Sequence, residues 1–158
     1  MTTSSKPNPI PLGYEGATPY LRCRNAANAI EFYKKAFGAS ELYRITMPDS
    51  RVGHAEIKIS RAIVMLSDEF PEMKIVGPET IGGSSVTILI YVEDVDAFVE
   101  RAVANGAKVT TPPADQFYGD RNCKITDPFG HEWMFATRKE EVSHEEQRKR
   151  ADAMFGKK

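Results

Sequence analysis

His54 and Glu56 are the two side chains whose types and spacing best suit chemistry. They stand two residues apart in GHAEIKI, where apolar residues alternate with them, so a β-strand would place both on one face. An imidazole beside a carboxylate can act as a base, and the same pair can supply two ligands to a divalent metal. The alternative is a solvated strand face continued by Lys58. A metal site would need a third ligand from elsewhere in the chain.

Tyr118, Asp120 and Arg121 form a second candidate group, just before the last predicted hairpin. A tyrosine and an arginine at the mouth of a cleft would orient a polar or anionic ligand. An Asp–Arg pair that stabilises a turn explains two of the three residues equally well.

The remaining reactive residue types point to structure rather than to chemistry. Cys23 and Cys123 lie in segments with apolar alternation, which predicts buried, reduced thiols without a paired base. His131 follows a DPFG turn and is expected to be exposed there. No phosphate-binding glycine loop, Ser/His/Asp arrangement or CxxC motif is found.

Composition narrows the class of protein. The chain has 158 residues, 21 basic and 22 acidic ones, and 41% hydrophobic residues, as in an ordinary soluble globular protein. The near-neutral net charge shows no excess of basic residues of the kind that binds nucleic acid. No apolar run reaches the roughly 18 residues of a membrane span. Residues 1–16 lack the apolar core of a signal peptide and are expected to form a flexible leader, so the protein is expected to be cytoplasmic.

The elements that must position these residues come in two similar series. In the first, a strand near 18–23 precedes a helix that Asn25 caps and Gly38 ends, and strands at 41–47, 53–60 and 62–68 follow. After a Pro/Gly/Ser-rich linker at 70–84, the second series repeats this order. It comprises a strand at 86–92, a helix capped by Asp94, a strand at 109–111 and a hairpin around the turn Asp127-Pro128-Phe129-Gly130.

A spacing of 68–69 residues aligns the two series, which indicates an internal duplication. The predicted fold class is therefore α+β, with two βαβββ modules. Ser143 begins a capping box that predicts a C-terminal helix to about Phe155.

With these elements in place, the chain resembles the vicinal oxygen chelate superfamily of glyoxalases, bleomycin-resistance proteins and dioxygenases. The resemblance rests on PYL, NAANAIEFYKKAFGA, GHAEI, VMLSDE, FYGDR and DPFGHEW, and together these motifs look most like the PhnB-like branch. It implies a curled mixed sheet with a cleft, usually completed by dimerisation. The implied division is a leader at 1–16, a domain at 17–138 with modules at about 17–69 and 85–138, and a polar tail at 139–158.

The resemblance also locates the places where metal-dependent members hold a divalent ion. Aligned on the helix and hairpin landmarks, these places fall on Thr18, Met65, Thr87 and Met134. A neutral hydroxyl and a thioether are poor ligands for the ions that such sites hold. We therefore expect no metal and no other cofactor.

The predicted function is metal-free binding of a small organic ligand by a homodimer, with no nucleic-acid or membrane partner. The face opposite the helices mixes methionine, tyrosine and polar groups, which suits such a ligand. The predicted ligand-binding residues are Tyr20, Met65, Thr87, Tyr91, Tyr118, Asp120, Arg121 and Met134. The alternative is a metal-dependent lyase or dioxygenase in which His54 and Glu56 are catalytic, with Asp120 as a further ligand.

Overall fold

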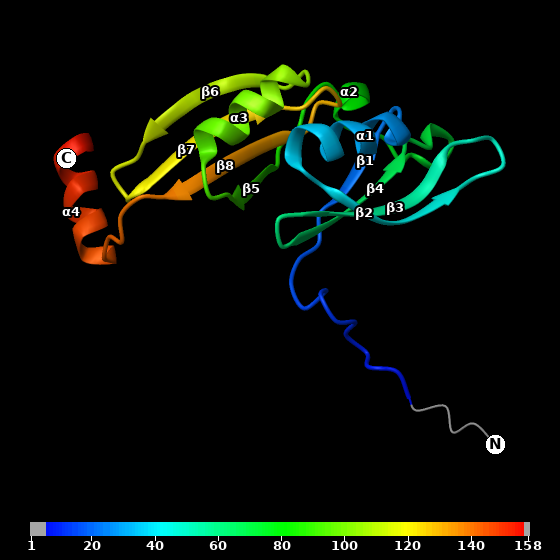
Figure 1. Cartoon of the computed structure of the whole chain (residues 1–158), viewed down its shortest axis with the longest axis horizontal. Helices are drawn as coiled ribbons and strands as arrows, with labels where there is room; N and C mark the ends of the chain where they lie inside the picture. The colour runs from blue at the N-terminus through cyan, green and yellow to red at the C-terminus, as the bar shows by residue number, and fades with distance from the viewer. Residues whose placement is uncertain (1–5, 157–158) are drawn as a thin grey trace.

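Two four-stranded sheets lie side by side, with their long helices on the same side (Figure 1). This computed structural model describes residues 6–156; residues 1–5 of the predicted leader and 157–158 of the tail lie outside that range. The first module consists of β1 (Tyr20–Cys23), α1 (Ala26–Phe37), β2 (Ser40–Thr46), β3 (Val52–Ile59) and β4 (Ala62–Asp68). The second consists of β5 (Thr87–Tyr91), α3 (Val95–Ala104), β6 (Lys108–Asp115), β7 (Asp120–Thr126) and β8 (Glu132–Arg138). The α+β fold of two βαβββ modules is confirmed.

Both sheets share one topology and one register. Their strand orders are β1-β4-β3-β2 and β5-β8-β7-β6, with the first pair parallel and the others antiparallel. Tyr20 pairs with Met65 in the first sheet, and Leu89 pairs with Met134 in the second. Both partners of the first pair are thus 69 residues before those of the second, as the predicted duplication requires.

The helices begin and end where the sequence predicts. The Asn25 side chain accepts a hydrogen bond from the backbone N–H of Asn28, and Gly38 ends α1 in the left-handed conformation at φ 66°. α1 then packs against α3, with the rings of Phe37 and Phe98 at 5.5 Å. The buried face of each sheet completes the core beneath them, and the two modules therefore share one apolar interior.

The turn of the last hairpin joins the modules through Asp127. Its buried carboxylate accepts hydrogen bonds from the hydroxyl of Tyr33 on α1 at 2.6 Å and from the indole N–H of Trp133 on β8 at 2.8 Å. The other carboxylate oxygen accepts from the backbone N–H groups of Phe129 and His131. A turn aspartate thus also fixes the first module to the second.

The connections and edges differ from the prediction. The linker contains a 3₁₀ turn, η1 (Pro71–Met73), and a short helix, α2 (Pro78–Ile81). β6 extends well beyond the predicted 109–111 even though it contains Pro112 and Pro113. It pairs only with β7, so these prolines lie in an edge strand, where a missing N–H donor is tolerated.

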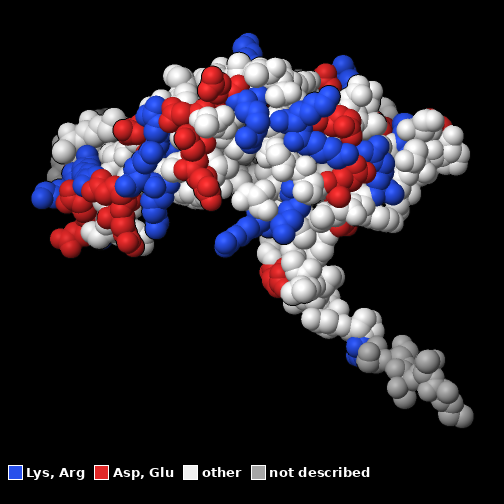
Figure 2. All heavy atoms as spheres, viewed as in Figure 1, with Lys and Arg blue, Asp and Glu red and all other residues white. Residues whose placement is uncertain are grey.

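The surface carries charged groups of both signs. Figure 2 shows lysines, arginines and carboxylates interspersed, with no broad single-sign patch on the face drawn. α4 (His144–Phe155) begins at the predicted cap Ser143 and lies at the far end of the second sheet (Figure 1). Among the described residues, no helix is long and apolar enough to cross a membrane.

Candidate functional site

The first sheet carries a row of hydrogen-bonded polar side chains on the face opposite its helix. The hydroxyl of Tyr20 lies 2.8 Å from Nδ1 of His54, and Nε2 of His54 lies 3.1 Å from a carboxylate oxygen of Glu56. Alternation along β3 puts His54 and Glu56 on one face, as predicted, and the pairing of β1 with β4 brings Tyr20 into reach. The second oxygen of Glu56 accepts a hydrogen bond from the hydroxyl of Tyr14. The leader was expected to be a flexible segment, yet its Tyr14 makes this specific contact.

Hydrogen bonding keeps the Glu56 carboxyl of this network ionised. Bonds from Tyr14 and then from His54 lower the pKa of the Glu56 carboxyl below its ordinary value. The bond to Glu56 raises the pKa of Tyr14 in return. Glu56 is therefore an anion at neutral pH and acts only as an acceptor.

An arginine flanks the same network. The guanidinium of Arg22 stacks on the ring of Tyr20, 3.8 Å from its centroid, and donates to the hydroxyl of Ser67 at 2.6 Å. Within residues 6–156, Arg22 has no carboxylate partner. It is a fixed cation beside a tyrosine.

The second sheet holds a pocket of about 270 Å³ on its corresponding face. An apolar floor and several polar groups line it: Leu89, Tyr91, Tyr118, Asp120, Asn122, Met134, Ala136, Arg138 and, from α4, Gln147. The pocket brings together four of the predicted ligand-binding residues, namely Tyr91, Tyr118, Asp120 and Met134.

Short hydrogen bonds fix the polar groups of this pocket. The hydroxyl of Tyr91 donates to the buried carboxylate of Asp120 at 2.6 Å, and this bond raises the pKa of Tyr91. The side-chain amide of Asn122 donates to the hydroxyl of Tyr118 at 2.6 Å. The tyrosines are thus held in place before any ligand arrives.

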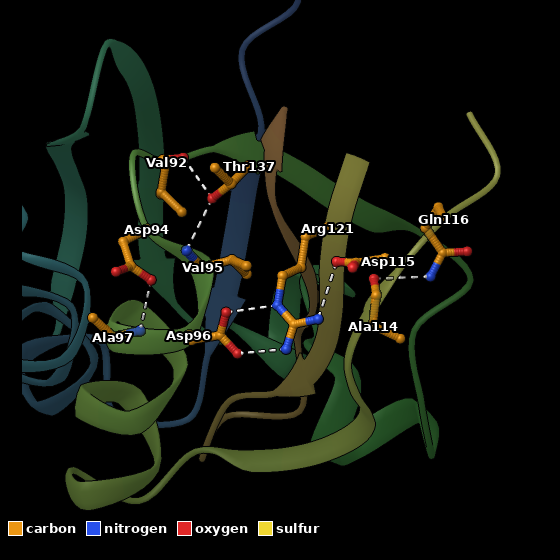
Figure 3. Close-up of polar contacts among 10 residues, drawn as sticks. All are labelled: Val92, Asp94, Val95, Asp96, Ala97, Ala114, Asp115, Gln116, Arg121 and Thr137. Atoms are coloured by element: carbon orange, nitrogen blue, oxygen red, sulfur yellow. Dashed lines mark hydrogen bonds and ion pairs between the residues drawn. The ribbon is translucent and has the colours of Figure 1, made fainter. Parts of the chain in front are cut away.

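The other predicted ligand-binding residues lie elsewhere. Tyr20 and Met65 belong to the face of the first sheet, and Thr87 lies exposed at the start of β5, outside the second-sheet pocket. Arg121 points to the helix side of its sheet. Its guanidinium binds Asp96 of α3 at 2.6 and 2.8 Å and Asp115 of β6 at 3.1 Å (Figure 3). The structure therefore does not bring Arg121 to the pocket.

The four positions that the family resemblance assigns to metal ligands carry side chains that do not suit a metal. Met65 and Met134 occupy equivalent strand positions and offer only thioethers, while Thr18 and Thr87 offer neutral hydroxyls. No three His, Cys, Asp or Glu side chains of residues 6–156 are placed to hold an ion. His54 and Glu56 thus have no third ligand within this range, since Asp120 belongs to the other sheet.

A second cavity, of about 450 Å³, lies between the modules. It is lined by residues from β1, β5, the linker and the start of β8, including Tyr20, Arg22, Ile81, Ile88 and His131. The sequence analysis did not predict this cavity, because it treated residues 70–84 only as a linker between the modules. Gly77 passes so close to β1 that a Cβ there would lie 2.2 Å from the carbonyl oxygen of Arg22.

The predictions that His131 is exposed and that Cys23 has no base nearby are wrong, whereas the predicted burial of both cysteines is confirmed. His131 is buried, with Nε2 3.1 Å from the carbonyl oxygen of Arg22 and 3.8 Å from the sulfur of Cys23. The docking of the linker and β1 over the turn covers it. Cys23 and Cys123 are free and buried, and burial raises the pKa of Cys123 to about 11 and that of Cys23 still further. Neither is a nucleophile at neutral pH.

Comparison with known proteins gives a consistent result. The family model described as Glyoxalase/Bleomycin resistance protein/Dioxygenase superfamily matches residues 17–135. The uncharacterized protein Mb0911c of Mycobacterium bovis is 44% identical over 132 residues, which cover 82% of this chain and 87% of that protein. The uncharacterized protein At5g48480 of Arabidopsis thaliana is 33% identical over 135 residues, 79% of each chain.

Solved structures show the same fold. The X-ray structure of the At5g48480 product aligns with a TM-score of 0.62 at 28% identity, covering 78% of this chain and 98% of that one. The fosfomycin resistance protein FosX of Listeria monocytogenes aligns with a TM-score of 0.59 at 16% identity, covering 84% of this chain and 96% of that one. At that identity the likeness concerns the fold alone.

Proposed function

The chain belongs to the Glyoxalase/Bleomycin resistance protein/Dioxygenase superfamily, and on that basis we propose that it binds a small organic ligand, without a metal, in the pocket over its second sheet. The quoted motifs, DPFGHEW and GHAEI among them, lead us to place it in the PhnB-like branch. A fold shared by many activities does not decide between them, so the proposal rests on the residues of the site.

The observation that carries the proposal is the composition of this one pocket. Met134 sits in its floor at a place where metal-dependent relatives would need a ligand, and a thioether there favours contact with an apolar or aromatic body. The hydroxyl of Tyr118, the carboxylate of Asp120 and the guanidinium of Arg138 surround that floor. An apolar floor with a few fixed polar groups is the usual form of a site for small organic molecules.

We also propose that the protein acts as a homodimer. The faces opposite the helices leave Tyr20, Tyr43, Ile45, Leu89 and Tyr91 each at least 40% exposed. A second copy covering these faces would remove this apolar surface from water and enclose the pocket.

The test combines elemental analysis, native mass and ligand-observed NMR with a panel of small aromatic compounds. We expect less than a tenth of an equivalent of bound transition metal, the mass of a dimer, and binding of aromatic probes that Met134→Arg abolishes by filling the pocket. Arg121→Lys is the matched control, because Arg121 faces the helix side, and it should retain binding. Probe binding that Met134→Arg leaves intact, or one equivalent of metal per chain, would refute the proposal.

A further inference from the structure

The polar network of the first sheet is not a requirement of the βαβββ fold. The second module provides an internal control, because its equivalent positions follow 68 or 69 residues later. There Leu89 replaces Tyr20, Asn122 replaces His54 and Lys124 replaces Glu56. The second module folds around the same register without an imidazole, a carboxylate or a phenol at these places. The shared register therefore does not require these three residue types, and the network is specific to the first module.

The hydrogen-bond partners determine which atom of each pair carries the proton. The Glu56 carboxylate can only accept, so Nε2 of His54 carries the hydrogen that bridges them. When the imidazole is neutral, Nδ1 is then the acceptor, and the hydroxyl of Tyr20, 2.8 Å away, is the group that can donate to it. Carboxylate, imidazole and hydroxyl thus stand in the order of a Ser-His-Asp triad, with a phenol in place of the serine.

We propose that Tyr20, His54 and Glu56 form a metal-independent proton relay that interconverts the keto and enol forms of α-keto acids. The phenol oxygen of Tyr20 takes a proton from the carbon next to the ketone while its own proton passes to Nδ1 of His54. Glu56 stabilises the resulting imidazolium. The proton on Tyr20 then moves to the enolate oxygen, and His54 returns its proton to Tyr20, so that no oxidant or co-reactant is consumed. Tyr20 is the catalytic residue, and His54 and Glu56 are positioning residues that act through it.

The surroundings of Tyr20 indicate the class of substrate. Tyr20 and Arg22 both line the cavity between the modules, whose other walls include the apolar side chains of Val76, Ile81 and Ile88. Among the described residues the Arg22 guanidinium has a hydroxyl as partner but no carboxylate, so it is available to pair with a carboxylate of a ligand. Because the guanidinium of Arg22 stacks on the ring of Tyr20, a carboxylate bound to Arg22 would lie beside that tyrosine, with an apolar substituent along the cavity. The inference does not depend on the pocket over the second sheet.

The network also explains the contact of the leader. Tyr14 occupies the oxygen of Glu56 that His54 leaves free, and so it holds the carboxylate plane in line with the imidazole. Tyr43 lies on the neighbouring strand with its ring centroid 6.1 Å from that of His54. In the part of the chain that the structure describes, its hydroxyl makes no hydrogen bond, so Tyr43→Phe is a matched control for Tyr20→Phe.

The experiment follows the ultraviolet absorbance of phenylpyruvate as it converts between keto and enol forms. The wild-type protein should accelerate the conversion above the buffer rate. Tyr20→Phe should lower kcat about 100-fold, in the range of general acid–base catalysis, while Tyr43→Phe keeps the wild-type rate. Arg22→Gln should raise KM for phenylpyruvate more than it changes kcat. Phenylacetone, which lacks the carboxylate, should react at the same rate with the wild-type protein and with Arg22→Gln.

Readouts specific to proton transfer separate the relay from a structural role. Added imidazole should restore activity to His54→Ala but not to Tyr20→Phe, and Glu56→Gln should lower kcat with little change in KM. Proton NMR in D₂O should show enzyme-dependent exchange at C3 of phenylpyruvate, a measurement that needs no variant. Absence of exchange with the wild-type protein, or equal rates for Tyr20→Phe and Tyr43→Phe, would overturn the proposal.

Discussion

Replacing Asp127 with alanine should remove a large part of the stability of the protein. Its carboxylate accepts bonds from two buried side-chain donors, the hydroxyl of Tyr33 and the indole N–H of Trp133, and from two backbone N–H groups of the turn. A buried donor left without an acceptor costs about 1–3 kcal/mol. With two such donors and a weakened turn, we expect the free energy of unfolding to fall by about 3–5 kcal/mol, out of a total of about 5–15 kcal/mol for a domain of this kind.

The assay is urea unfolding followed by the fluorescence of Trp133, the single tryptophan, with circular dichroism as a second probe. Tyr33→Phe is the control, because it removes one donor and leaves the carboxylate with three, and should cost only about 1 kcal/mol. Asp127→Asn should fall between the two, since one amide oxygen cannot serve both pairs of donors. If Asp127→Ala costs no more than Tyr33→Phe, the carboxylate does not hold the modules together as described.

Three other perturbations test separate parts of the structure. Gly77→Ala places a Cβ against the backbone of β1 and should lower the free energy of unfolding by about 2 kcal/mol or more, whereas Gly16→Ala, with nothing within 4 Å, should change it by less than about 0.5 kcal/mol in the same assay. The pKa of Glu56 is lowered in the folded state, so the ionised carboxylate stabilises the folded protein. This stabilisation is complete above about pH 4.3, the ordinary pKa of a glutamate, and is lost as the pH falls through the folded-state pKa. The stability advantage of wild type over Glu56→Gln should therefore shrink between pH 6 and pH 3. With an aromatic disulfide reagent at pH 8, Cys23 and Cys123 should not react in the native protein and both should react after denaturation, and a rapidly reacting native thiol would contradict their burial.

The sequence predicted the regular elements well because their signals are local. The side chains of Asn25, Asp94 and Ser143 cap the helices as expected, and the spacing of 69 residues places Met65 and Met134 at equivalent positions. Alternation along β3 was enough to place His54 and Glu56 on one face. Each of these inferences depends on residues close in sequence, or on a repeat that the sequence displays directly.

The features that the sequence did not show depend on contacts between distant segments. The burial of His131 needs β1 and the linker to cover the turn, and the bond from Tyr14 to Glu56 needs Tyr14 to lie against the face of the first sheet. Asp120 and Arg121 are adjacent in the sequence, yet in a strand adjacent side chains point to opposite faces. Applying that alternation to β7 would have separated them from the sequence alone.

The two outer edges of the sheets also differ in a way that limits how copies can associate. β6 presents Pro112 and Pro113 and cannot supply a full row of N–H donors, whereas β2 has no proline and exposes Leu42 and Ile45. A sheet with two open edges can add copies indefinitely and grow into a ribbon. Of these two described outer edges, β2 is the one without proline, so a pair of copies joined edge to edge through β2 would present only the proline-bearing β6 at its outer ends. Prolines at such an edge disfavour the addition of a further strand to β6.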